Sequence, residues 1–506
     1  MSPSSPAVPD REPFRPAADR VTYAGADPDR VADADHNLGL WPLVGLIIGS
    51  MIGAGIFHLP AQMAGTAAPG PTLIGWGIFG TGMLVLALVF QNLGRRAPTV
   101  DGGVYGFAKD GFGDYVGFTS AWGYWFSTWT GSVGYLVLLF STLGRYLSPF
   151  KDGQTWQAIL GASVVLWLVH GLILAGIRQA TVINAIVSAC KVIPLVAFLA
   201  LGVIAWRRDV FTADVWGHGV QVEGAGLGSV GAQVNGMMLL AVWYFLGIEG
   251  ASVYAARARD RADSAKATMI GFLTVLTLLV GVNVLSYGIV RQAELAGYPE
   301  PSLAGVLRDA VGPWGEHFIA AAIVVSLVGA YMSWMLLSSE ILLYPAHDGV
   351  LPRVFGKENS HGVPVTGLWL TSLCMQVMLL MGNTYTKLTL LAGAMVLLPY
   401  FWTAAYQVLI AVRDHRGDSA GTRVREITLG VLAVIFAVYL IYFAAGLPYL
   451  LVACLAFFLG TILYVWGRRE RGLALFSRVE WVLFAVVTVA ALAGVWQLAH
   501  GQIAVS

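Results

Sequence analysis

The sequence predicts an all-α polytopic membrane protein, and three observations carry this prediction. Hydrophobic residues make up 57% of the 506-residue chain and charged residues only 12%, about half the charged fraction of a typical soluble domain. The mean hydropathy is +0.70. Apolar runs of about 20 residues, the length at which a helix crosses a bilayer, recur between short polar links.

We expect thirteen spans. Their ranges are 39–65, 71–93, 117–148, 156–175, 180–206, 232–255, 265–290, 315–345, 365–382, 386–412, 426–445, 448–467 and 477–499. The third and the eighth are long enough to tilt or to extend beyond the bilayer. Residues 1–37, rich in Pro, Ala, Asp and Arg, are expected to form a disordered cytoplasmic tail without a cleavable signal peptide.

Lys and Arg residues are distributed unevenly between alternate links. One set of links, together with the N-terminal segment, carries 22 of them, and the opposite set carries 7. Because positive residues concentrate on the cytoplasmic side, the N-terminus is expected in the cytoplasm of a cell whose inner (plasma) membrane holds the protein. An odd number of spans then places the C-terminus outside.

Several classes of function find no support in the composition. A net charge of +1 gives no reason to expect nucleic-acid binding. The cysteines lie inside apolar runs, the histidines lack ligand spacing, and no Gly-rich link has a P-loop pattern. We therefore expect no metal, no cofactor, no ATP hydrolysis and no enzymatic activity. The residues considered are Cys190, Cys374, Cys454, His58, His170 and His347.

Two spans contain glycines at their centres, where glycine supports a helix least. The first holds "GSMIGAGIF" (49–57), and the sixth holds "WYFLGIEGAS" (243–252). Unwound backbone at mid-membrane is tolerated only around a cavity. Its N–H groups attract a carboxylate and its carbonyls accept from an ammonium. Two interruptions five helices apart therefore predict a transporter of two inverted five-helix repeats with an amino-acid site.

Three motifs carry a family resemblance over roughly residues 38–470. They are "GSMIGAGIFHLP" (49–60), "GGVYGFAKDGFGDYVGFTSAWGYW" (102–125) and "DGVLPRVFGKENSHGVP" (348–364). With "FLGIEGAS" they resemble the amino acid–polyamine–organocation superfamily, and most closely its arginine/ornithine antiporters. The resemblance implies a ten-helix core at 38–412, made of repeats at about 38–206 and 232–412, with further transmembrane helices in 413–506.

The resemblance also implies a substrate site. Backbone N–H groups at Ser50, Gly53, Ala54 and Gly55 would bind the substrate carboxylate; helix packing of small residues alone is the alternative. Trp243 and Trp334 would flank a cationic side chain through cation–π contact, worth up to ~2 kcal/mol. Tyr244 and Gly247, in the interruption of the sixth span, complete this part of the site.

Three charged residues inside spans are expected to act in gating or proton coupling. Glu249 costs about 2.5–3.5 kcal/mol at mid-membrane, so it is either a gating or proton-sensing carboxylate or a neutral, hydrogen-bonded one. Lys191 matches the fifth-helix lysine of sodium-independent members, unless it snorkels to the interface. Glu340 either answers substrate charge or faces the cytoplasmic cavity.

On the third span, Tyr124, Thr128 and Ser132 share a helical face. The resemblance places Thr128 and Ser132 in the compartment of the substrate side chain. These small hydroxyl residues, and Tyr244 where a smaller residue is expected, depart from the family pattern and leave the substrate open.

The expected function is exchange of a cationic amino acid, such as arginine, for ornithine or a related amine by alternating access. A proton-coupled uptake permease for a neutral or aromatic amino acid is the alternative. A membrane enzyme or channel is disfavoured because no catalytic or pore-lining set appears. The expected partners are amino-acid substrates and the lipid bilayer, and a homodimer stays open.

Overall fold

The computed structural model describes residues 39–97, 100, 102–176, 181–222, 224–250, 261–413 and 419–500. Within this part of the chain, eight helices are long and apolar enough to cross a membrane. Shorter apolar helices accompany them at Leu40–Met51, Ala189–Ala205 and Val365–Leu380. The prediction of an all-α polytopic membrane protein is therefore confirmed. The tail expected at 1–37 lies outside the described residues.

The long helices follow the apolar runs of the sequence. They are α4 (Pro69–Arg96), α6 (Asp114–Gly144), α7 (Trp156–Leu174), α8 (Thr181–Ala205), α12 (Arg261–Ile289), α15 (Pro313–Ile341), α17 (Val365–Leu380), α18 (Tyr385–Arg413), α19 (Ala420–Tyr439), α20 (Gly446–Glu470) and α21 (Arg478–Ala499). A π-helical segment, η4 (Leu440–Ala445), joins α19 to α20 without a non-helical loop.

The polar links contain short elements that the hydropathy pattern does not predict. They are α5 (Val104–Phe112), η2 (Ser148–Gly153), α9 (Arg208–Phe211), α13 (Gln292–Ala296), α14 (Ser302–Val311), α16 (Leu343–His347), η3 (Arg353–Gly356) and a hairpin of β1 (Gln221–Val222) with β2 (Ala225–Gly226). These elements cap the two ends of the helix bundle.

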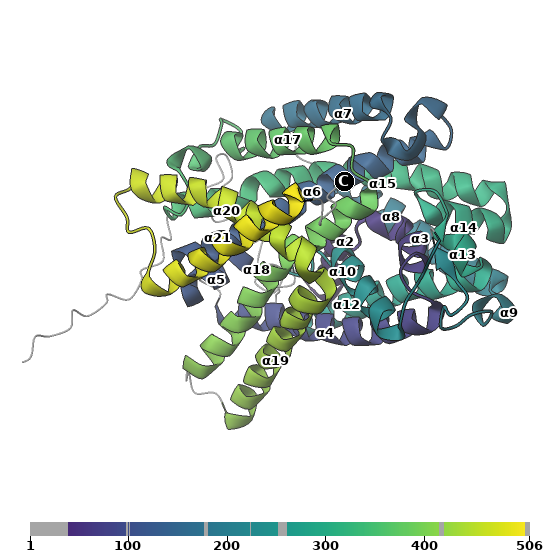
Figure 1. The fold of residues 1–506 in the computed structure, drawn as a ribbon, viewed down its shortest axis with the longest axis horizontal. Helices are drawn as coiled ribbons and strands as arrows, with labels where there is room; N and C mark the ends of the chain where they lie inside the picture. The colour runs from purple at the N-terminus through teal and green to yellow at the C-terminus, as the bar shows by residue number, and fades with distance from the viewer. Residues whose placement is uncertain are drawn as a thin grey trace, which may run out of the picture.

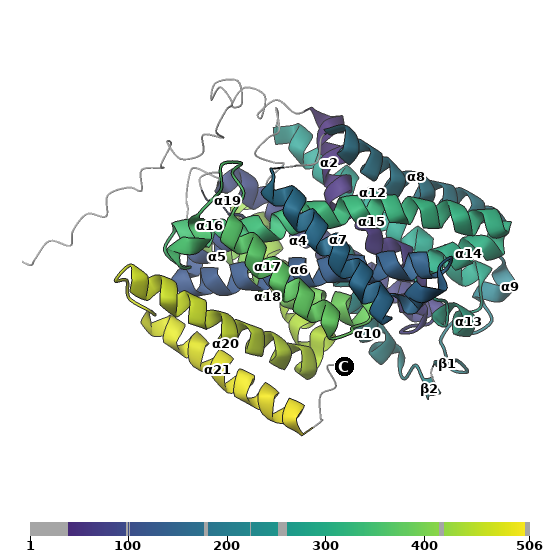
Figure 2. The same cartoon turned by 90° about the horizontal axis from the view of Figure 1, so that it is seen from above.

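Helix α6 forms the centre of the bundle. In its most apolar stretch of 18 residues, 89% of the residues are buried inside the protein. Helices α15 and α18 pack against it. By contrast, α20 and α21 lie together on the outside (Figures 1 and 2). Only 17% of the residues in the most apolar stretch of α21 are buried. The apolar side chains that α21 leaves exposed suit contact with lipid.

The first expected span is broken. Helix α2 (Leu40–Met51) ends before two extended residues, Ile52 and Gly53, and the chain continues as η1 (Ala54–Phe57) and α3 (Leu59–Ala64).

The sixth expected span is broken too. Helix α10 (Val230–Tyr244) ends ahead of Gly247, which has a φ of +108°. A Cβ atom at position 247 would overlap the backbone carbonyl oxygen of Ser50. Both the positive φ and this close approach require glycine, and they bring the two breaks into contact.

The bundle has two distinct ends. At the α16 end, the Tyr105 hydroxyl on α5 donates to Asp348, beyond α16, at 2.8 Å. At the α14 end, the Arg145 guanidinium donates to the carbonyls of Pro299 and Pro301, both at 2.9 Å, and so fastens the α13–α14 link to α6.

Candidate functional site

A cavity of about 700 Å³ lies between the two helix breaks and the α16 end. This volume is within the range of small-molecule sites. Six residues predicted for the site line it, and they come from α2, the α10 break, α8 and α15. They are Ser50, Lys191, Gly247, Glu249, Trp334 and Glu340.

Glu249 is the most highly connected polar group in this cavity. Its Oε1 accepts from the Tyr124 hydroxyl of α6 at 2.5 Å, and its Oε2 accepts from the Tyr400 hydroxyl of α18 at 2.8 Å. The backbone N–H of Gly247 lies 3.1 Å from both oxygens. Three donors directed at one carboxyl group are typical of a carboxylate held in place. Glu249 therefore connects the α10 break to two central helices.

Ser50 joins the two breaks from the other side. Its hydroxyl donates to the carbonyl of Ile47 at 2.9 Å and lies 3.3 Å from the carbonyl of Gly247. The cavity is therefore lined both by the end of α2, at the break in the first span, and by the break that follows α10 in the sixth span.

Lys191 and Glu340 complete the charged lining of the cavity. Lys191, on α8, is only 8% exposed, whereas Glu340, on α15, lies nearer the α16 end together with Tyr344. The cavity therefore combines two acidic side chains with one basic side chain.

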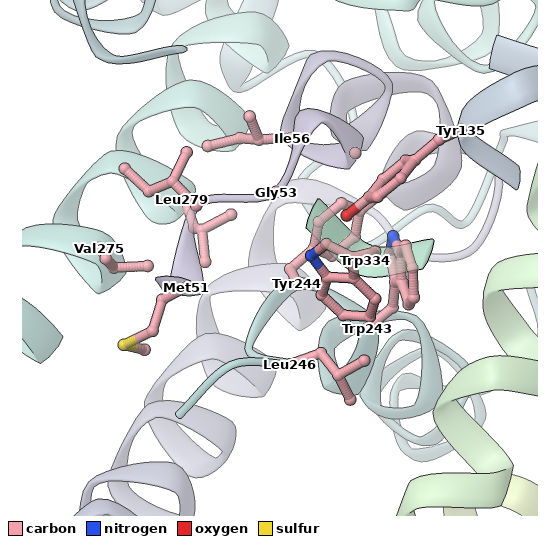
Figure 3. Close-up of a pocket in the computed structure, with 12 residues that line it drawn as sticks. Met51, Gly53, Ile56, Tyr135, Trp243, Tyr244, Leu246, Val275, Leu279 and Trp334 are labelled. Carbon is pink, nitrogen blue, oxygen red and sulfur yellow. The ribbon is translucent and has the colours of Figure 1, made fainter. Parts of the chain in front are cut away.

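A second, much smaller cavity of about 10 Å³ lies deeper in the protein, with room for about one water molecule. Gly53, Gly55, Trp243 and Tyr244 line it. Trp334 is shared with the large cavity and separates the two spaces. Figure 3 shows the rings of Trp243, Trp334 and Tyr135 gathered beside the extended segment at Gly53.

The aromatic residues of this inner region form one cluster. The ring centroids of Tyr135 lie 5.7 Å from Trp243 and 5.9 Å from Trp334, and the two tryptophans are 5.8 Å apart. The indole N–H of Trp243 donates to the Tyr385 hydroxyl at 3.0 Å. Both Trp243 and Tyr385 approach Gly55 so closely that a Cβ there would overlap them.

Beyond this cluster, toward the α14 end, a polar network closes the protein. The Tyr244 hydroxyl donates to the side-chain carbonyl of Gln62 on α3, and the Gln62 amide donates to the Thr386 hydroxyl of α18 at 2.8 Å. The described conformation is therefore hydrogen-bonded shut on this side, while the large cavity extends from the breaks toward α16.

Two predicted residues occupy different surroundings. Thr128 and Ser132 are fully buried and line neither cavity. The Thr128 hydroxyl donates to the carbonyl of Trp125 and accepts from Ser338 at 2.9 Å, and the Ser132 hydroxyl donates to the carbonyl of Thr128. In this conformation Thr128 joins α6 to α15, whereas the Ser132 hydroxyl bonds within α6. The side chain of Ala54 lies outside the described part of the structure.

The structure also adds site residues that the sequence reasoning missed, namely Tyr135, Tyr385, Tyr400 and Gln62. Tyr135 had a signal, because it continues the face of Tyr124, Thr128 and Ser132 by one further turn. For the residues of α18 there was no comparable signal, since an isolated tyrosine in an apolar run predicts no partner.

Comparison with known proteins agrees with this geometry. Residues 38–451 match the family model described as amino acid permease. An arginine/ornithine antiporter of Pseudomonas aeruginosa is 46% identical over 480 residues, covering 93% of this chain and 98% of the relative.

Two further relatives widen the range of described substrates. An L-lysine transport protein of Corynebacterium glutamicum is 39% identical, covering 93% of this chain and 97% of the relative. An arginine/agmatine antiporter of Chlamydia pneumoniae is 35% identical, covering 93% and 98%. Matches of this length and identity leave one assignment: the chain is a multi-pass membrane transporter of the amino acid permease family.

Proposed function

We propose that this protein exchanges cationic amino acids across the cell membrane, taking up arginine or a similar substrate while ornithine or a related amine leaves. The observation that carries the proposal is the large cavity, in which the carboxyl group of Glu249 and the aromatic face of Trp334 meet backbone of both helix breaks. The names of the relatives support it, since arginine, ornithine, agmatine and lysine share a cationic side chain.

In this proposal the two breaks recognise what all amino acids have in common. Backbone N–H groups at Gly53, Ala54 and Gly55 bind the substrate carboxylate, and carbonyls of the α10 break accept from the ammonium group. Because Gly53 and Gly55 face only the small cavity, the substrate reaches them after the aromatic cluster rearranges.

The side chain is recognised separately. Trp243 and Trp334 flank the guanidinium or ammonium group, and Glu249 supplies a negative charge on the α16 side of Trp334. Lys191 replaces a bound sodium ion, so that transport needs none, and Glu340 gates the entrance. Thr128 and Ser132 support the site from α6.

Alternating access would involve the whole ten-helix core. Repeats at about 38–206 and 232–412 rock against one another, and the helices of 413–506 extend the scaffold to thirteen spans. The excess of Lys and Arg in the links at the α16 end supports a cytoplasmic location for this end and for the N-terminus. The described conformation is then open toward the cytoplasm.

Counterflow in proteoliposomes tests this proposal. Vesicles loaded with labelled ornithine should release it slowly into buffer and at least tenfold faster when external arginine is added. A proton-coupled permease would instead accumulate substrate in empty vesicles under a pH gradient, without any internal amino acid. Efflux that external arginine does not accelerate would contradict exchange.

A further inference from the structure

His58, which is buried, and Glu300, which is half-buried, form a pair at the α14 end, outside the proposed substrate site. His58 is the residue between η1 and α3 and is 5% exposed. Glu300 belongs to the link between α13 and α14, and its side chain is 20% exposed. The Nε2 atom of His58 lies 3.5 Å from Oε1 of Glu300.

The neighbouring backbone determines where the protons of this pair lie. The N–H of Ser302 points at Nδ1 of His58 at 3.3 Å, and a backbone N–H can only donate. Nδ1 therefore carries no proton, so the imidazole is neutral and Nε2 bears the hydrogen. The protonated Nε2 of His58 then lies 3.5 Å from the carboxyl group of Glu300, and any proton that this pair gains must reside on that carboxyl group.

The surroundings of Glu300 favour its protonated form. Burial, the largest cause, raises the pKa of Glu300 to about 8; a hydrogen bond from Ser141 at 3.4 Å opposes the shift, and the negative charge of Asp152 on η2 adds to it. The guanidinium of Arg145, which bonds to the carbonyls of Pro299 and Pro301 on either side of Glu300, is itself paired with Glu316 at 2.5 Å.

Among the described residues, the phenols of Tyr244 and Tyr385 also face Glu300. Both are neutral at physiological pH, so neither compensates a buried carboxylate. Burial and the nearby negative charge of Asp152 therefore favour a bound proton over the free carboxylate.

The pair is mechanically joined to the first helix break. Ser302, the first residue of α14, donates its hydroxyl to the carbonyl of His58 and accepts from the N–H of Ala61, both at 3.1 Å. The ring of His58 packs edge-on against Tyr385 at 5.7 Å, and Tyr385 is the partner of Trp243. The α13–α14 link therefore holds α3 and the aromatic cluster in the closed arrangement.

We infer that His58 and Glu300 form an outer proton-binding site that must take up one proton from the external solution for the protein to close on that side. This inference rests on the proposed orientation and exchange cycle. When the α14 end opens, water reaches Glu300, its pKa returns toward about 4.3, and the proton is released. The proton is bound and released at Glu300 Oε2, next to Ser141.

The sign of the pH effect follows from this linkage. The closed state binds the proton more tightly, so its stabilisation is complete at low external pH and is lost as the pH rises through about 8. Between about 4.3 and 8, each unit of external acidification should shift the closed-to-open ratio toward closed by up to tenfold.

Accessibility of a buried outer residue measures this equilibrium. Thr389 is fully buried in the closed conformation, next to Gln62, so a Thr389→Cys substitution, in a chain whose three native cysteines are replaced by serine, reports opening. Labelling by a membrane-impermeant methanethiosulfonate from outside should slow by up to a hundredfold from pH 7.5 to pH 5.5. Division by the rate for an exposed cysteine at the same end of the protein, Asp209→Cys on α9, removes the titration of the thiol itself.

Two variants make the outcome decisive. Glu300→Gln mimics the protonated acid and should abolish the pH dependence, while Glu294→Gln on neighbouring α13 should retain it. Asp152→Asn, at a position of positive φ that asparagine accepts, leaves the pair intact and should move the midpoint to lower pH. A pH response that survives Glu300→Gln overturns the inference. The labelling assay needs no transport, so its outcome can be interpreted even if the counterflow experiment shows no exchange.

Discussion

The indole ring of Trp243 lies directly over Gly131 of α6, so closely that a Cβ at position 131 would overlap its six-membered ring. The absence of a side chain on α6 therefore allows Trp243 to lie 5.8 Å from Trp334 and to donate to Tyr385. The position of the main aromatic wall of the proposed site depends on this one glycine.

Gly131→Ala should displace Trp243 and weaken substrate binding. Overpacking of this kind costs about 1–3 kcal/mol, so we expect the KM for arginine to rise about tenfold. Gly171→Ala on α7 is the matched control, because a Cβ there meets nothing within 4 Å. The concentration dependence of labelled arginine uptake into ornithine-loaded proteoliposomes provides the measurement. Equal KM values for the two variants would be incompatible with the role given to Gly131.

Trp243→Ala should be more damaging than Trp243→Phe. A full cation–π contact is worth up to ~2 kcal/mol, which corresponds to a KM increase of about 30-fold for Trp243→Ala. Phenylalanine preserves an aromatic face but loses the hydrogen bond to Tyr385, so a smaller increase is expected. Trp156→Ala, at a 70% exposed position on α7, should leave KM unchanged. If Ala and Phe at position 243 behaved alike, aromatic contact with the substrate would be ruled out.

Transport should not depend on sodium. Lys191 lines the large cavity, and in the proposed mechanism its ammonium group takes the place of a bound sodium ion. Exchange rates in sodium chloride and in choline chloride should therefore agree within about twofold. Loss of exchange in choline would show that a sodium ion is required and that Lys191 has another role.

Glu480 should matter for stability but not for transport. Its Oε1 accepts from the N–H of Tyr115 at the start of α6 at 2.6 Å, and its Oε2 accepts from the N–H of Ser477 at 2.7 Å. Because one carboxylate caps α6 and α21 together, Glu480→Gln loses one charge-assisted hydrogen bond, worth about 1.5–3 kcal/mol.

Thermal unfolding in detergent measures this loss, and we expect the midpoint to fall by a few degrees with the KM unchanged. Glu358→Gln, at an exposed position, is the control and should unfold at the normal temperature. An unaltered midpoint for Glu480→Gln would mean that α21 is held by apolar packing alone.

Glu249→Gln should nearly abolish exchange of cationic substrates. Glutamine cannot carry the negative charge, and its NH2 group would face a hydrogen-bond donor where a carboxyl oxygen now accepts one. A decrease in kcat/KM of at least tenfold is therefore expected. Tyr400→Phe removes a single donor and should have a smaller effect. Exchange by Glu249→Gln at the normal rate would remove this carboxyl group from the proposed mechanism.

Hydropathy predicted most of this fold because lipid leaves a transmembrane segment few alternatives to a helix. The break at Gly53 was visible as clustered glycines, and the break at Gly247 as glycines around a costly carboxylate. The links were less predictable. Helices α13 and α14 are short and depend on tertiary contacts, such as the hydrogen bond from Ser302 to the carbonyl of His58. The local sequence pattern does not predict such contacts.

The proposed site shows the same division. Glu249 and Trp334 stood out because an ionisable residue and a motif tryptophan are unusual inside a span. Thr128 and Ser132 were predicted to lie in the compartment of the substrate side chain, but small hydroxyl groups in a helix can bond to the carbonyls of the preceding turn, as both do here. The partnership of Tyr400 with Glu249 depends on the packing of α18 against α6, and hydropathy carries no information about it.

The most direct test of the central claim compares arginine with citrulline, which has the same shape but a neutral side chain, as external substrates in counterflow. External arginine should accelerate the efflux of labelled ornithine from proteoliposomes at least tenfold, and citrulline should leave it near the rate in buffer. Equal acceleration by citrulline, or none by arginine, would contradict exchange selective for cationic amino acids.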